Sequence, residues 1–250
     1  MAFLPRLAGL LALTLTLPAA AVEAPVPWSV SRQMVVVTTD GWDATQGTLR
    51  TYVREGASWT AVGDASPVVI GKTGSAWGVG LSPPQPDGPQ KKEGDGRSPA
   101  GVFRIGKAFG YAATNATAMP YMGLTASDYC VDVDGSPYYN QLVDEKKVGE
   151  QAVAGATEPM RRDIHFQGDH AYRIGFVIEH NPEGKKGQGS CIFAHLWKTP
   201  TSGTAGCTAM ADDVMERLLA WLDPTKKPVF VLLPRSEYVR LHDAWNLPSP

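Results

Sequence analysis

Glycine and proline recur so often along this chain that they favour many short strands joined by turns over a bundle of long helices. The sequence holds 26 glycines and 20 prolines among its 250 residues. Apolar runs fall between these residues, as expected for strands that cross a core. Strands are predicted at residues 34–39, 49–54, 59–62, 68–70, 102–105, 172–179, 191–196 and 229–233. The predicted fold class is therefore mainly β with a few helices.

Helical periodicity is clearest near the C-terminal end. Residues 211–222 place their apolar side chains on one face of a helix, and Pro224 ends the pattern. A second, shorter helix is predicted over residues 236–245. By contrast, residues 81–97 (LSPPQPDGPQKKEGDGR) are rich in proline, glycine and charge, which predicts a long exposed loop.

The first residues have the pattern of an export signal. Arg6 precedes an apolar run over residues 7–17, which is too short to span a bilayer as a stable helix. Residues 18–21 (PAAA) then offer an A-x-A cleavage site. This pattern predicts a signal peptide over residues 1–21 and an exported single domain over residues 22–250, in an oxidising environment. We expect no transmembrane segment after cleavage; an uncleaved anchor is the less favoured interpretation.

The charge balance limits the classes of partner. Lys and Arg number 23 and Asp and Glu number 25, a net charge of −2, which argues against a nucleic-acid-binding protein. Hydrophobic residues make up 43% of the chain, which suits a packed core and excludes wholesale disorder. The three cysteines lack zinc-finger spacing, and His165 and His170 fit no standard ligand motif. No metal site is therefore predicted.

One histidine and one cysteine are the candidates for catalysis. His195 ends a predicted strand, and Cys207 follows Gly206, 12 positions later, just before the predicted helix. The thiolate is the reactive form of cysteine, a helix N-terminus stabilises it, and an imidazole accepts its proton. The amides around Gly206 are expected to hold an oxyanion. A buried structural thiol beside a hydrogen-bonded histidine is the alternative, which the Gly-Cys turn before a helix makes less favoured.

This segment resembles the catalytic motif of the L,D-transpeptidase (YkuD) family, in which a histidine and a variable loop precede Ser/Thr-x-Gly-Cys. Residues 204–207 (TAGC) match that pattern. Blocks similar to those of the exported bacterial branch of the family occur at residues 70–78, 92–103, 130–140 and 189–196. The resemblance covers about residues 34–234. It implies a partly open β-barrel or sandwich with a helix following the catalytic cysteine.

The resemblance also implies an activity. The protein would be a periplasmic or cell-wall-associated enzyme that crosslinks peptidoglycan stem peptides. Cys207 would form a thioester, His195 would be the general base, and Gly206 and Thr204 would belong to the oxyanion site. No cofactor is needed, and a monomer is expected. The sequence departs from the family at Ala205 and Ala209, where His and Asn are common; these changes bear on the acceptor and on transfer against hydrolysis.

Two other functions stay open at this point. A thiol hydrolase of peptidoglycan-linked peptides, an L,D-carboxypeptidase or amidase, would use the same nucleophile and base. A non-catalytic peptidoglycan-binding module would need neither, so the intact pair of His195 and Cys207 argues against it.

Six further residues are assigned provisional roles. Arg161 or Arg162 suits a substrate carboxylate, with a solvated charge pair as the alternative. Tyr139 and Asn140 are predicted to line the groove, with a core position as the alternative for Tyr139. A catalytic Cys207 leaves Cys130 and Cys191 as a hypothetical disulfide, because the resemblance places the loop after Cys130 near the groove; two unpaired buried thiols are the alternative.

Overall fold

The computed structural model describes Met1 and residues 26–249. The predicted signal peptide lies outside the described residues, apart from Met1. The strands are β1 (Gln33–Thr39), β2 (Gln46–Glu55), β3 (Ser58–Val69), β4 (Ser75–Trp77), β5 (Ser98–Gly110), β6 (Tyr121–Gly123), β7 (Asp128–Cys130), β8 (Leu142–Asp144), β9 (Glu158–Pro159), β10 (Ile174–Ile178), β11 (Phe193–Leu196), β12 (Thr208–Met210) and β13 (Val229–Pro234). The helices are α1 (Glu145–Val148), α2 (Glu150–Val153), α3 (Arg162–His165), α4 (Asp212–Trp221) and α5 (Arg235–Leu241), with a 3-10 turn at Pro224–Lys226.

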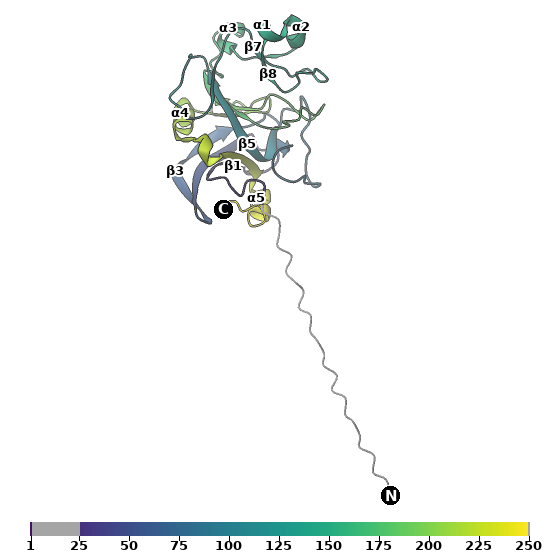
Figure 1. Cartoon of the computed structure of the whole chain (residues 1–250), viewed down its shortest axis with the longest axis vertical. Coiled ribbons are helices and arrows are strands. Elements are labelled where there is room, and N and C mark those ends of the chain that lie inside the picture. The colour runs from purple at the N-terminus through teal and green to yellow at the C-terminus, as the bar shows by residue number, and fades with distance from the viewer. Residues whose placement is uncertain (2–25, 250) are drawn as a thin grey trace.

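A closed ring of strands forms the body of the molecule (Figure 1). Hydrogen-bonded neighbours follow the order β10-β11-β12-β3-β2-β1-β13-β5, and β5 pairs with β10 to close the ring. Most neighbours are antiparallel, whereas β1 with β13 and β11 with β12 are parallel. The predicted mainly β fold is confirmed. The barrel, expected to be partly open, closes its ring of backbone pairs between β5 and β10.

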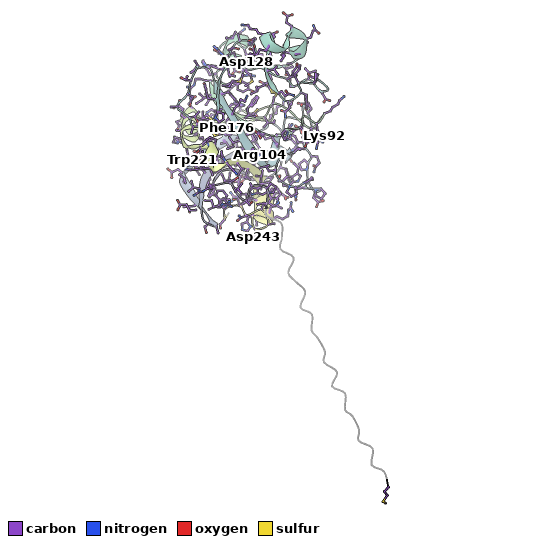
Figure 2. All side chains as sticks on the ribbon, viewed as in Figure 1. Lys92, Arg104, Asp128, Phe176, Trp221 and Asp243 are labelled. Atoms are coloured by element: carbon purple, nitrogen blue, oxygen red, sulfur yellow. A yellow bond between two sulfur atoms is a disulfide. The ribbon has the colours of Figure 1, made fainter. Side chains whose placement is uncertain are left out.

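The core centres on the parallel pair of β1 and β13. Every residue of β13 is buried, and β1 is buried along almost its whole length. Continuous apolar runs of this kind are typical of strands covered on both faces. Helix α5 packs against β1 and β13, and α4 packs against β10 and β11. Figure 2 shows Phe176, a fully buried residue of β10, within this body.

A second, small sheet lies with α1, α2 and α3 at one end of the molecule, opposite α5 (Figure 1). Its strands follow the order β8-β7-β9, and a separate apolar cluster of Val131, Val143 and Val153 supports it. Figure 2 marks this end by Asp128 and the opposite end by Asp243. We call residues 124–169 the small-sheet region. Its elements are only two to four residues long, which is why hydrophobic periodicity did not predict them.

The C-terminal helices agree only in part with the sequence. Helix α4 lies within the predicted 211–222 and buries the predicted apolar face, but α5 ends at Leu241 instead of continuing to 245. Trp245 nevertheless packs back on the body, edge-on to Trp28 with the ring centroids 5.7 Å apart. A further difference lies after Cys207, where β12 precedes α4. Among the described residues, no helix has the length and apolar character needed to cross a bilayer.

Candidate active site

A cavity of about 400 Å³ lies between the barrel and the small-sheet region. The barrel contributes β11, β12 and the turn before Cys207, and the opposite wall comes from β9 and α3. Both predicted catalytic residues, Cys207 and His195, line this cavity. The predicted exposed loop over residues 81–97 also reaches it through Lys91 and Glu93, so part of that loop belongs to the site.

The turn before Cys207 holds the backbone of the nucleophile in place. The Cys207 carbonyl accepts hydrogen bonds from Thr204 Oγ1 at 2.6 Å and from Ser98 Oγ at 2.9 Å. Gly206 has a φ of +155°, and a Cβ there would lie 3.1 Å from the Arg97 carbonyl oxygen, which explains the glycine. The Gly206 amide donates to Thr204 Oγ1 at 3.1 Å. Thr204 and Gly206 therefore shape the turn, instead of pointing a free amide at a substrate.

The Cys207 thiol is buried, with 7% of the residue exposed. Its Sγ accepts a hydrogen bond from the Phe193 amide at 3.3 Å and donates to the Cys191 carbonyl at 3.5 Å. Burial, followed by the charge of Glu158, raises the pKa of Cys207 to about 12. The resting form is therefore the neutral thiol.

The prediction that a helix N-terminus stabilises the thiolate of Cys207 is wrong. Cys207 leads into β12, and α4 begins only at Asp212. The dipole of a helix acts within its first turn, so α4 does not stabilise a thiolate at Cys207. The three residues of β12 are too few to be distinguished from the start of a helix by their sequence alone.

His195 lies on β11, which pairs in parallel with β12, and Cys207 directly precedes β12, so the two candidate residues come from neighbouring parts of the barrel. Its Nδ1 is 2.8 Å from the Leu196 carbonyl oxygen. That contact requires a proton on Nδ1 and leaves the lone pair on Nε2. Burial lowers the pKa of His195 to about 4, so the imidazole is neutral at pH 7. A neutral imidazole is the form that accepts the proton of a thiol.

Alanine side chains occupy the two positions where this sequence departs from the family. Ala209 pairs with His195 across β11 and β12, and Ala205 lies in the turn before Cys207. Both line the cavity. At positions 205 and 209, where His and Asn are common in the family, the wall of the cavity is therefore formed by small apolar side chains.

The two candidate arginines point in different directions. Arg162 lines the cavity, where its guanidinium bonds Glu158 Oε1 at 3.0 Å and Asp169 Oδ2 at 2.9 Å. Arg161 is paired with Asp163 at 2.7 Å and lies over the Tyr111 ring, away from the cavity. Arg161 thus forms a partly exposed ion pair outside the cavity, and Arg162 is the one of the two that lines the cavity.

Tyr139 and Asn140 lie behind the cavity wall. Tyr139 is buried and its hydroxyl donates to Glu93 Oε2, so the core position applies. Asn140 Oδ1 accepts from the Cys191 amide at 2.8 Å, and its Nδ2 donates to the carbonyls of His180 and Asn181. Neither residue lines the cavity. They support the groups that do.

A disulfide joins Cys130 at the end of β7 to Cys191 just before β11. Cys207 is the free cysteine of the three. The bridge links the small-sheet region to the strand that carries His195, and the carbonyl of Cys191 is the one that the Cys207 thiol contacts. The segment that is tied down by the disulfide at Cys191 is therefore also the segment that contacts the Cys207 thiol.

Two residues of the site had no sequence signal as functional residues. Glu158 enters the cavity from β9, and Tyr172 packs its ring edge-on against His195 with the centroids 5.2 Å apart. The Tyr172 hydroxyl donates to Glu158 Oε1 at 2.8 Å. Tyr172 lies in a predicted strand without any pattern that marks it as functional, and Glu158 belongs to no recognised motif.

A buried cysteine at the start of one barrel strand and a neutral histidine on the neighbouring strand are suited to chemistry by a thiol nucleophile. The sequence model of the L,D-transpeptidase catalytic domain (YkuD) matches residues 34–231. The chain belongs to this family, which connects it with peptidoglycan. Searches of the curated proteins and of the solved structures find no match.

Proposed function

We propose that this protein is an exported cysteine acyltransferase that acts on peptidoglycan stem peptides by L,D-transpeptidation, in the periplasm or at the cell wall. The observation that carries the proposal is that His195 on β11 and Cys207 directly before the parallel strand β12 line one cavity. The family match supports the substrate class. Residues 22–250 would form its single catalytic domain.

The first half-reaction forms a thioester. The Cys207 proton passes to His195 Nε2 while Sγ attacks the carbonyl carbon of the L-centre of a diamino acid. The C–N bond to the following D-amino acid then breaks, and the proton on Nε2 goes to the departing amine. Because thiol and imidazole are both neutral at rest, proton transfer accompanies the attack and no thiolate accumulates beforehand.

The Cys207 amide is the proposed oxyanion donor. It forms no hydrogen bond with any residue of the described part of the chain. An amide next to the nucleophile, with its carbonyl held by Thr204 and Ser98, is oriented before substrate arrives.

The second half-reaction separates transfer from hydrolysis. An acceptor amine attacks the thioester carbon, the S–C bond breaks, and the proton lost by the amine returns to Cys207 through His195. The small, apolar surface at Ala205 and Ala209 favours an organic acceptor over water.

Mass spectrometry of a defined reaction tests the proposal. Purified mature protein is incubated with tetrapeptide-bearing muropeptides, with and without an amine acceptor. Wild type should form an acyl-enzyme on the peptide that holds Cys207 and then yield dimers. Shortened monomers without dimers would show a hydrolase, and unchanged muropeptides retained on sacculi would show a binding module.

A further inference from the structure

The carboxylate of Glu158 enters the active-site cavity with one of its two oxygens already bonded. Oε1 accepts from the Tyr172 hydroxyl at 2.8 Å and from Arg162 Nη1 at 3.0 Å. No residue among 26–249 forms a hydrogen bond to Oε2. The side chain keeps 20% of its surface exposed and lines the cavity beside Cys207. One carboxylate oxygen is therefore open to a bound molecule.

The cations that line the cavity are already paired with carboxylates. Lys91 Nζ is 2.5 Å from Asp95, and Lys198 Nζ is 3.2 Å from Asp169. Arg162 shares its guanidinium between Asp169 and Glu158. Each of these three cations therefore already has a carboxylate partner.

The remaining carboxylates on the wall accept hydrogen bonds only from uncharged groups. Asp132 accepts from the amide and hydroxyl of Thr157. Glu93 accepts from Tyr139, Ser190 and the Gly94 amide. The lining of the cavity therefore holds three carboxylates, Glu93, Asp132 and Glu158, and three cations, Lys91, Arg162 and Lys198. Because each of these cations is already paired with a carboxylate, the open Oε2 of Glu158 is the feature of the lining that favours a cationic ligand group.

Tyr172 places the open oxygen of Glu158 close to the chemistry. The same side chain touches the His195 ring with its edge and Glu158 with its hydroxyl. A group bound at Glu158 is thus separated from the base by one aromatic ring. The charge of Glu158 also contributes to the raised pKa of Cys207, so a cation bound there would oppose that effect.

We propose that Glu158 is a specificity-determining residue that binds a primary ammonium group of the substrate through Oε2. The inference rests on the proposed function, because a diamino-acid stem peptide presents such a group either on the donor side chain or on the acceptor. A primary ammonium has three donors and a full charge, which matches a carboxylate oxygen with no other partner.

The experiment separates the two half-reactions. Wild type, Glu158→Gln and the control Glu183→Gln are compared, since Glu183 is an exposed carboxylate outside the cavity. Glutamine keeps one oxygen as the acceptor for Tyr172 and Arg162, and its NH₂ group takes the place of the open oxygen Oε2. Thioester formation is timed with a free-amine donor peptide and with its side-chain N-acetylated form. The ratio of aminolysis to hydrolysis is then measured with a free-amine acceptor.

Two results support the inference. A loss of roughly tenfold to a hundredfold in thioester formation, confined to the free-amine donor, identifies the donor ammonium. An unchanged thioester step with a tenfold lower ratio of aminolysis to hydrolysis identifies the acceptor ammonium. Glu183→Gln should match wild type in both.

Two other results overturn it. Equal losses with free and acetylated donors and an unchanged ratio would make Glu158 structural, and no change in either step would remove it from recognition. If wild type forms no thioester with either donor, the proposed function fails first and the inference falls with it. If Glu158→Gln does not fold, Glu158→Asp takes its place, with an expected loss of roughly threefold to tenfold from the withdrawn carboxylate.

Discussion

The two walls of the active-site cavity are built in different ways. The barrel wall presents His195 from β11 and Cys207 from the turn that leads into the neighbouring strand β12, and both residues are buried. The small-sheet wall presents Glu158 and Arg162 from a two-residue strand and a four-residue helix. Ion pairs and one disulfide hold that wall, with few backbone ladders. The proposed reacting residues therefore lie on the barrel wall, which has more cooperative backbone contacts, and the charged residues lie on the small-sheet wall, which has fewer.

The difference extends to electrostatics. The barrel wall removes water from its two reacting groups, which raises the pKa of Cys207 and lowers that of His195. On the small-sheet wall, the charged side chains form ion pairs with one another. Their charges also act on the thiol, because Glu158 raises the pKa of Cys207 and Arg162 lowers it. Changes on the barrel wall should alter the chemical step, whereas changes on the small-sheet wall should alter which substrate reacts.

The largest effect is expected at Cys207 itself. Cys207→Ala removes the sulfur that forms the thioester, so turnover should fall to background while the fold remains. Circular dichroism and the thermal unfolding midpoint check the fold, and muropeptide turnover checks the activity. A well-folded Cys207→Ala protein that still turns over would end the cysteine mechanism.

His195→Ala should lower kcat by about 10²–10⁴-fold, because the thiol then loses the imidazole that is proposed to accept its proton. His165, on the exposed side of α3, supplies the matched control, and His165→Ala should keep wild-type turnover. Equal activity of His195→Ala and wild type would assign proton transfer to another group.

The sequence singled out Cys207 and His195, which the structure places in one cavity, but it did not reveal the residues around them. Cys207 and His195 stand in one local motif, and the strand that carries His195 has a clear apolar pattern. Glu158 lies 49 positions before Cys207 and is brought there by strands of two or three residues, which carry no period to detect. Tyr139 and Asn140 are predicted to line the groove but lie behind the cavity wall, because a sequence does not reveal which way the side chains of a loop point. The helix-start argument failed because three residues of β12 intervene.

Removing the disulfide should loosen the small-sheet wall and leave the barrel intact. The bridge spans 61 positions, so the chain-entropy model gives about 4 kcal/mol of stabilisation, less any native strain. Cys130→Ser with Cys191→Ser should lower the free energy of unfolding by up to that amount. The double variant is used because a single change would add a second free thiol.

Peptide mapping supplies the check on that pairing. Alkylation of the unreduced, denatured protein should label Cys207 alone and leave a linked pair of Cys130 and Cys191 peptides. Three labelled cysteines, or an unchanged denaturant midpoint in the double variant, would contradict the role given to the bridge.

The pH dependence of thiol labelling tests how the barrel wall treats its nucleophile. With a pKa of about 12, the thiolate fraction of native Cys207 rises tenfold per pH unit, so iodoacetamide labelling should increase about a hundredfold from pH 7 to 9. The same cysteine in the denatured, unreduced protein should begin to level off near pH 9, close to an ordinary thiol pKa of about 8.5. Native labelling that is already constant below pH 8 would show a stabilised thiolate instead.

The smallest effect is expected in the turn behind the nucleophile, where the barrel wall is fixed by two hydroxyl groups. Thr204→Val keeps the shape of the side chain but removes the donor to the Cys207 carbonyl and the acceptor for the Gly206 amide. The loss should be about 1–2 kcal/mol of stability, with a severalfold drop in kcat and little change in KM, because only the orientation of Cys207 is altered. Thr204→Ser should restore both values, and Thr201→Val in the exposed part of the same loop serves as the control. Because Ser98 Oγ bonds the same carbonyl, Thr204→Val combined with Ser98→Ala should cost more than the two single changes added together. Strict additivity, or a change in KM alone, would mean that these hydroxyls do not position the nucleophile.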